Sequence, residues 1–254
     1  MDITYLSYLL LAVAGFSAGV MNAVAGGGTF LTFPALIFAG VPPIVANVSS
    51  TVALFPGSFA SAWAYRANFR NFEGISLPVL LGVNFAGGAT GAILLLVTSQ
   101  RAFDVVIPWL LLFASLIFAF GPKLAPRLRQ AIEIGPTTLL ILQFIVGIYG
   151  GYFGGAVGIA TMALWSLLGR SDIHEMNAAK TLVVGTMNTA AVMCFIVAGK
   201  ISWPHTLIMM AAAIAGGYIG ARTARRMNAK HVRALVIVIS FGVTIAFFWK
   251  LYRP

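Results

Sequence analysis

Residues 15–34 read GFSAGVMNAVAGGGTFLTFP, a glycine-rich stretch inside an apolar run that extends from residue 3 to residue 40. As a single helix that run would be about 57 Å long at ~1.5 Å per residue, whereas the hydrocarbon core of a bilayer is about 30 Å thick. The run must therefore fold back on itself. Glycine permits a tight turn or a close approach of two backbones. Gly26, Gly27 and Gly28 therefore predict the turn of a hairpin made of two short helices.

A second apolar run, residues 137–168, repeats this arrangement. It would be roughly 48 Å long as one helix, so it is also too long for a single span. Its central glycines are Gly150, Gly151, Gly154, Gly155 and Gly158. Both runs are expected to form broken or re-entrant helical hairpins.

The composition places the chain in a membrane. Of its 254 residues, 60% are hydrophobic and 9% are charged, against about 25% charged residues in an ordinary soluble domain. So few charges cannot cover a water-exposed surface, which excludes a soluble enzyme, and the high hydrophobicity excludes disorder. The single cysteine, Cys194, excludes a disulfide framework. The first apolar run follows Asp2 and lacks the basic flank of a cleavable signal peptide.

The two halves of the sequence match each other. With an offset of 132, Gly15–Gly19 lies over Gly147–Gly151 and Thr29 lies over Thr161. With small gaps, Ser50-Thr51 falls on Lys180-Thr181, Ser58 on Asn188, and Gly87–Gly91 on Gly216–Gly220. The chain therefore divides into a first repeat, 1–120 (hairpin 3–40; helices 45–65, 76–99 and 103–120), a basic linker, 121–136, and a second repeat, 137–254 (hairpin 137–168; helices 176–198, 203–221 and 233–250).

Each half has five segments, an odd number, so the second half should be inverted relative to the first. Eleven of the sixteen Lys and Arg residues fall in loops 66–74, 121–136, 169–175 and 222–233, and four lie on the other side. An excess of Lys and Arg marks cytoplasmic loops, which places these loops and the linker in the cytoplasm. The predicted fold class is an all-α integral membrane protein with two inverted structural repeats, each a glycine-rich hairpin plus three transmembrane helices.

Ionisable side chains are almost absent from the apolar stretches. All six acidic residues and all three histidines lie in loops or at segment ends. The sequence therefore shows no intramembrane proton relay and no metal site. Ser58 has no histidine at membrane depth that could act as its base. We expect neither an enzyme nor a bound cofactor.

The polar residues inside the apolar stretches are mainly neutral hydrogen-bond donors. Broken helices also present free N–H groups and a positive dipole end at their N-termini, and two such hairpins meeting at mid-membrane would share one site. That environment suits an oxyanion. The predicted substrate-binding residues are Asn22, Gly26, Gly27, Gly28, Thr29, Ser50, Thr51, Ser58, Gly154, Gly155, Gly158, Lys180, Thr181 and Asn188.

Structural roles stay open as alternatives for these residues. Ser, Thr and Asn also join membrane helices by hydrogen bonding, and small residues allow close packing. The glycine triplet could be a plain turn, and Lys180 could extend to the cytoplasmic interface. The alignment of Lys180 with Ser50, beside a matched threonine, favours a role in the site.

Five motifs in three regions carry a family resemblance: GFSAG, GGGTFLTFPAL and GVPP within 15–43, GIYGGYFGG at 147–155, and NAAKT at 177–181. In this order they resemble the sulfite exporter TauE/SafE family, also called the four-toluene-sulfonate uptake permease family. The resemblance implies a transporter for anions of sulfur compounds, including sulfite and organosulfonates. The second hairpin departs from the pattern at Ile159-Ala160 and Ser166, so the two hairpins need not contribute equally.

We therefore expect export of sulfite or an organosulfonate across the bacterial inner membrane, by alternating access driven by the membrane potential. An anion channel, an importer of a sulfur oxyanion and a non-transporting membrane subunit of a larger complex are the alternatives. The expected partners are a small anionic substrate and the lipid bilayer, and not nucleic acid, because the net charge of +10 is spread over short loops. The face Gly216-Gly217-x-x-Gly220 could pack within the chain or between chains, and a homodimer is expected.

Overall fold

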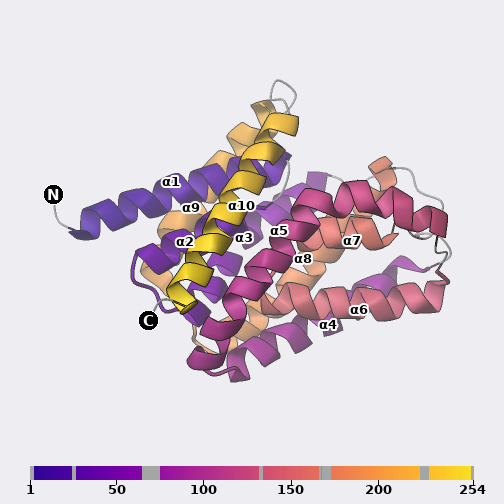
Figure 1. Ribbon diagram of the computed structural model, residues 1–254, viewed down its shortest axis with the longest axis horizontal. Coiled ribbons are helices and arrows are strands. Elements are labelled where there is room, and N and C mark those ends of the chain that lie inside the picture. Colours follow the sequence, from indigo (N-terminus) through magenta and orange to yellow (C-terminus); the bar gives the residue numbers. More distant parts are fainter. Residues whose placement is uncertain are drawn as a thin grey trace.

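The structure is a computed structural model that describes residues 3–24, 27–64, 75–131, 134–165, 167, 173–223 and 229–252. Over these ranges the chain forms helices joined by short connections, without a β-strand (Figure 1). The helices are α1 (Ile3–Val24), α2 (Thr29–Phe38), α3 (Pro43–Ala64), α4 (Leu77–Val97), α5 (Gln100–Ala131), α6 (Pro136–Tyr152), α7 (Val157–Trp165), α8 (Ile173–Val197), α9 (Trp203–Thr223) and α10 (Ala229–Tyr252).

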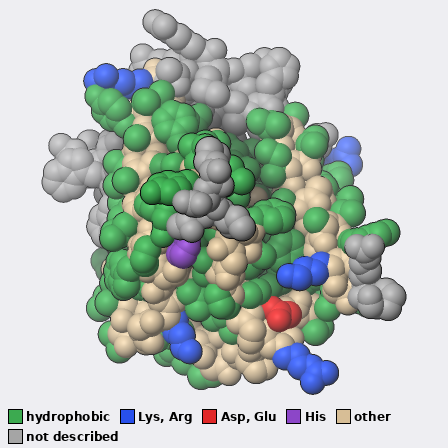
Figure 2. Space-filling model, turned by 90° about the vertical axis from the view of Figure 1, so that its left-hand side faces the viewer, with side chains coloured by type: hydrophobic (Ala, Val, Ile, Leu, Met, Phe, Trp, Pro, Cys, Tyr) green, Lys and Arg blue, Asp and Glu red, His purple; other side chains and the backbone are tan. Residues whose placement is uncertain are grey.

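Five of the described helices are long and apolar enough to cross a membrane. The stretches are Tyr5–Ala23, Leu77–Val97, Gln100–Gly121, Ala179–Val197 and Ala234–Tyr252. Large hydrophobic side chains are exposed along them, and Figure 2 shows apolar side chains over much of the described part of one face, with scattered basic ones. Such a surface suits lipid rather than water. The prediction of an all-α integral membrane protein is confirmed.

Each hairpin combines a longer helix with a short one. α1 has 22 residues and α2 has 10, while α6 has 17 and α7 has 9. The expectation of two short helices is wrong for α1, which is long enough to span. Its own glycines do not interrupt it because they pack against another helix. The turns contain left-handed backbone at Gly27 (φ +88°) and Gly154 (φ +78°), a conformation that glycine adopts without steric cost.

Helix α5 has 32 residues and continues through 121–131, most of the range predicted from the sequence to be a basic linker. Its membrane-compatible part ends at Gly121. The remainder mixes good helix formers (Lys, Arg, Leu and Ala) with Pro122 and Pro126, which disfavour a helix interior, so composition alone does not account for this extension. The other helix boundaries differ from the predicted ones by at most four residues.

Helices from different halves of the chain pack through matched glycines. A Cβ built on Gly15 of α1 would lie 2.5 Å from the carbonyl oxygen of Met209 on α9. A Cβ built on Gly87 of α4 would lie 2.8 Å from that of Phe144 on α6. Only glycine permits such an approach. The same holds one turn further along each pair, at Gly19, Gly91, Gly151, Gly216 and Gly220. The face Gly216–Gly220 therefore packs within the chain.

These contacts also give the directions of the helices. Gly15 and Gly19 of α1 contact Met209 and Ala213 of α9 in the same order, so the two helices run parallel. By the same reasoning α4 and α6 are parallel. α5 and α10 are antiparallel, because Trp109 contacts Phe248 while Ser115 lies against Thr244, earlier in α10. The pairs α1/α9 and α4/α6 each combine one helix from the first half with one from the second, so both pairs hold the two halves together.

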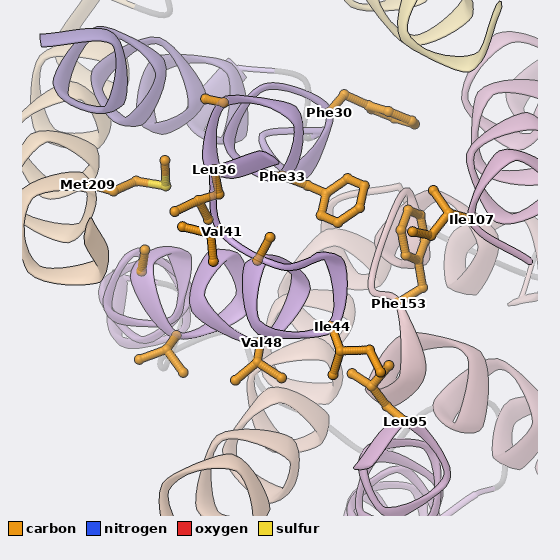
Figure 3. Close-up of a cluster of buried hydrophobic side chains, with 14 of the residues drawn as sticks. Phe30, Phe33, Leu36, Val41, Ile44, Val48, Leu95, Ile107, Phe153 and Met209 are labelled. Atoms are coloured by element: carbon orange, nitrogen blue, oxygen red, sulfur yellow. The ribbon is translucent and has the colours of Figure 1, made fainter. Parts of the chain in front are cut away.

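The two hairpins meet through apolar side chains. Phe33 of α2 contacts Phe153 of the α6–α7 turn edge to face, with ring centroids 5.9 Å apart (Figure 3). Phe33 also stacks on Phe247 of α10 at 5.7 Å. The turn at Gly27 touches Phe118 of α5, and the turn at Gly155 touches Ala114, one helical turn away. Both turns therefore lie on α5, with a packed core between them.

Candidate functional site

The first glycine turn is closed by a side-chain cap. Asn22, at the end of α1, accepts a hydrogen bond through Oδ1 from the backbone N–H of Gly28, with the two atoms 2.7 Å apart. A Cβ on Gly28 would lie 2.7 Å from Asn22 Nδ2, so the cap requires glycine there. Thr29 then begins α2, and Gly26 lies outside the described residues. The structure brings Asn22 and Gly28 together and gives this N–H group a partner within the chain.

The predicted hydroxyls of α3 have partners inside the protein. Ser50 is fully buried, and its Oγ lies 2.6 Å from Oγ1 of Thr32 on α2. Thr51 donates to the carbonyl oxygen of Asn47, one turn earlier, at 3.0 Å. Ser58 lies in α3, and its side chain is outside the described part. Ser50 therefore joins α2 to α3, whatever further role it has.

Asn47 is a buried polar residue between the two halves. Its Nδ2 donates to the carbonyl oxygen of Tyr152, at the end of α6, with a distance of 2.8 Å. Its Oδ1 is buried and has no hydrogen-bond partner in the described structure. The sequence marks Asn47 only as a polar residue in an apolar stretch. Its contact with the second hairpin, 105 positions away, is not encoded in local spacing.

The second glycine turn lies beside a lysine. Gly155 accepts a hydrogen bond through its carbonyl oxygen from the hydroxyl of Tyr149, at 2.7 Å. On α7, a Cβ built on Gly158 would lie 3.4 Å from Cδ of Lys180 on α8. The aliphatic part of Lys180 therefore lies across the first turn of α7. This places a half-buried positive charge next to the broken hairpin.

Three predicted site residues share α8. Lys180 and Thr181 are adjacent, and Asn188 follows Thr181 by seven residues, about two helical turns, on the same face. All three side chains are partly accessible. Helix α8 packs against α3, α4, α6 and α7, so polar groups on it are surrounded by protein rather than by lipid alone. The structure thus places one cation, one hydroxyl and one amide along a central helix.

A buried polar chain fixes the far end of the second hairpin. Trp165 of α7 donates through Nε1 to Gln143 of α6 at 2.8 Å, and Gln143 donates to Asn84 of α4, also at 2.8 Å. Asn84 donates to the carbonyl oxygen of Leu80 at 2.7 Å. Sequence reasoning missed Gln143 and Trp165 as partners. The available signal was a glutamine within the apolar stretch of α6.

Known proteins with similar sequences indicate a membrane transporter. The family described as "Sulfite exporter TauE/SafE" matches residues 11–247. A Haemophilus influenzae protein named "Probable membrane transporter protein" is 32% identical over 96% of this chain and 95% of its own length. Escherichia coli YfcA is 29% identical over 92% of this chain and 88% of its own, and Bacillus subtilis YunE is 22% identical over 92% and 94%. Both are also named probable membrane transporter proteins. No solved structure matches.

The apolar helices, the lipid-compatible surface and these relatives define a multi-pass membrane protein of the transporter class rather than an enzyme. The match extends from α1 to α10, through both hairpins. The chain belongs to the sulfite exporter TauE/SafE family of membrane transporters.

Proposed function

We propose that this transporter carries a small sulfur-containing oxyanion, sulfite or an organosulfonate, and exports it across the bacterial inner membrane. The family description supplies the sulfur chemistry. The residues supply the sign of the charge, because hydroxyl, amide and ammonium groups donate hydrogen bonds to an oxyanion. The substrate site would lie along Lys180, Thr181 and Asn188, next to the second glycine turn.

The observation that carries the proposal is the position of Lys180. Its side chain lies across Gly158 at the start of α7, on a helix that four others surround. A charged side chain inside a membrane protein is costly and marks a substrate or ion pathway by default. A fixed positive charge beside a broken helix attracts an anion and repels a cation.

The membrane potential favours export. Moving one charge through 100 mV changes the free energy by about 2.3 kcal/mol, so a dianion that leaves a cell at about −150 mV inside gains roughly 7 kcal/mol. At about 1.4 kcal/mol per tenfold, that sustains an outward gradient on the order of 10⁵. Export therefore needs no coupling cation, whereas import would need one.

The helix directions support alternating access between two inverted repeats. The parallel pairs α1/α9 and α4/α6 and the antiparallel pair α5/α10 are those expected if the second half repeats the first upside down. Transporters built this way move one repeat against the other around a central site. The apolar contact between Phe33 and Phe153 would then close the direct route between the two hairpins.

The test uses purified protein in liposomes loaded with sulfite. A potassium gradient with valinomycin sets the membrane potential, and sulfite efflux is followed with and without an imposed pH gradient. Saturable efflux that follows the potential alone is the expected result.

Efflux that requires a proton gradient would contradict export driven by potential alone. Flux that never saturates would indicate a channel. If sulfite does not move, methanesulfonate and benzenesulfonate are tested next. Failure of all three anions would overturn a sulfur oxyanion as the substrate and favour a subunit that requires a partner.

A further inference from the structure

Gly185 of α8 has unfilled space beside it. The residue is buried, yet a Cβ built on it would meet no other atom within 4 Å. Every other buried glycine in the described residues has a neighbour within that distance. Close helix packing therefore does not explain a glycine at this position, and a helix interior disfavours glycine relative to alanine.

The space lies among the predicted substrate-binding residues. Thr181 precedes Gly185 by four residues and Asn188 follows it by three, so both lie on the same side of α8. Val192 follows by seven residues on the same face and is only 6% exposed. This face of α8 therefore points into the protein and not into lipid. Asn188 makes no hydrogen bond to any residue that the structure describes, so its amide is available to a ligand.

The backbone of Gly185 is already engaged. Its carbonyl oxygen accepts a hydrogen bond from Oγ1 of Thr189 at 2.8 Å, and the residue lies in the middle of a continuous helix. The glycine therefore does not present free backbone donors, as the start of a broken helix would. What it leaves is unfilled space around the position of a Cβ, on the side of α8 that carries Thr181 and Asn188.

The matched position in the first half is filled. With the offset of 130 that places Ser50-Thr51 on Lys180-Thr181, Gly185 corresponds to Phe55. Phe55 packs against the hydrophobic core. The two matched positions thus differ: a large side chain fills the first, and the second has space beside it.

We propose that Gly185 is a size-determining residue of the substrate site, and that the oxyanion lies against it between Thr181 and Asn188. The inference rests on the transport function proposed above. A side chain at position 185 would occupy the space that the substrate uses. The effect should grow with the size of the organic group on the sulfonate.

The experiment compares Gly185→Ala and Gly185→Val with Gly242→Val in liposomes. Gly242 of α10 is exposed and also has nothing within 4 Å of a built Cβ, so the control adds the same side chain outside the site. For each protein, Tm in detergent and KM for sulfite, methanesulfonate and benzenesulfonate are measured. We expect Gly185→Ala to raise KM by at least about tenfold, as one extra carbon in a pocket does. Gly185→Val should raise it further and affect benzenesulfonate most, with no loss of Tm.

Three results would overturn this inference. An unchanged KM for Gly185→Val, while the wild type transports, would leave the proposed function intact and remove Gly185 from the site. A rise in KM that is equal for all three anions would remove its role in size selection. If the wild type carries none of the three anions, the proposed function itself fails and the inference fails with it.

Discussion

The two hairpins, α1–α2 and α6–α7, occupy matched places in their halves but are held by different side chains. The first is joined to α3 by the hydroxyl pair Thr32 and Ser50. At the matched positions the second has Leu164 and Lys180, and Lys180 lies across α7. The first hairpin therefore forms a neutral internal contact where the second places a positive charge.

A second set of contacts shows the opposite difference: here the second hairpin is held by polar side chains, and the matched contact of the first is apolar. The second is fixed by the chain of Trp165, Gln143 and Asn84. The residues matched to these three are apolar and buried, namely Phe33 and Leu11 in the first half and Ala213 in the second. The glycine contacts between helices, by contrast, are the same in both halves. The two hairpins therefore differ in their polar contacts, while the glycine contacts between helices are alike.

The largest effect is expected at the shared scaffold. In Gly91→Ala the new Cβ would overlap the backbone carbonyl of Ile148, and backbone atoms cannot rotate away. The free energy of unfolding should fall by about 3 kcal/mol, the upper end for overpacking, and the same should hold for Gly216→Ala in the other pair. Thermal unfolding in detergent measures this.

Gly82→Ala is the matched control on α4, since nothing lies within 4 Å of its built Cβ. It should be neutral or stabilising by up to about 1 kcal/mol. A stable Gly91→Ala protein together with an unstable Gly216→Ala protein would mean that the two helix pairs are not equivalent.

The next largest effect is expected where the halves differ most. Lys180→Ala should lose most sulfite efflux while the protein still inserts and elutes as a single species. Loss of a charged hydrogen bond of about 1.5–3 kcal/mol corresponds to roughly a tenfold to hundredfold loss. The control is Lys200→Ala, because Lys200 is exposed in the connection between α8 and α9. Efflux by Lys180→Ala at the wild-type rate would mean that Lys180 does not bind the substrate and only extends to the cytoplasmic interface of the membrane.

The buried polar chain offers a test in which its polar contact is converted to the apolar contact at the matched positions. Gln143→Leu leaves Asn84 Oδ1 and Trp165 Nε1 without the partner that joins them. Each unpaired buried group costs about 1–3 kcal/mol, so unfolding in detergent should occur at a clearly lower temperature.

The triple variant Asn84→Ala, Gln143→Leu, Trp165→Phe carries the side chains of the three matched positions, Ala213, Leu11 and Phe33. It should recover much of the lost stability, because removing all partners together is nearly neutral. A triple variant less stable than Gln143→Leu alone would show that packing volume, and not hydrogen bonding, holds α7 in place.

The membrane class and the glycine turns are accessible to sequence reasoning because both depend on local composition. Hydrophobicity over about 20 residues predicts the spans, and a glycine cluster in an overlong run predicts the break. The length of α5 is not predictable this way. Hydropathy falls at Gly121 and Pro122 and Pro126 follow it, signals that predict an end, whereas the helix continues to Ala131.

The partners of the polar residues are the part that the sequence does not reveal. Ser50 and Lys180 look alike as matched polar residues in apolar stretches. Which neighbour such a residue meets depends on which helix lies opposite. Thr32 lies opposite Ser50, while Gly158 lies against Lys180. These pairings come from tertiary packing, and no spacing rule along the chain gives them.

The smallest expected effect separates packing from binding in the first half. Ser50→Ala removes one hydroxyl of a pair whose other member, Thr32, still donates to the carbonyl oxygen of Gly28 at 3.2 Å. Because Thr32 keeps that partner, the loss of stability should be only about 1 kcal/mol. Ser50 is fully enclosed, so sulfite efflux per folded protein should stay close to the wild-type value. If efflux instead falls as far as in Lys180→Ala with Tm preserved, Ser50 contacts the substrate in another state of the transport cycle. The two hairpins would then share the site, and the contrast between them would be confined to this one conformation.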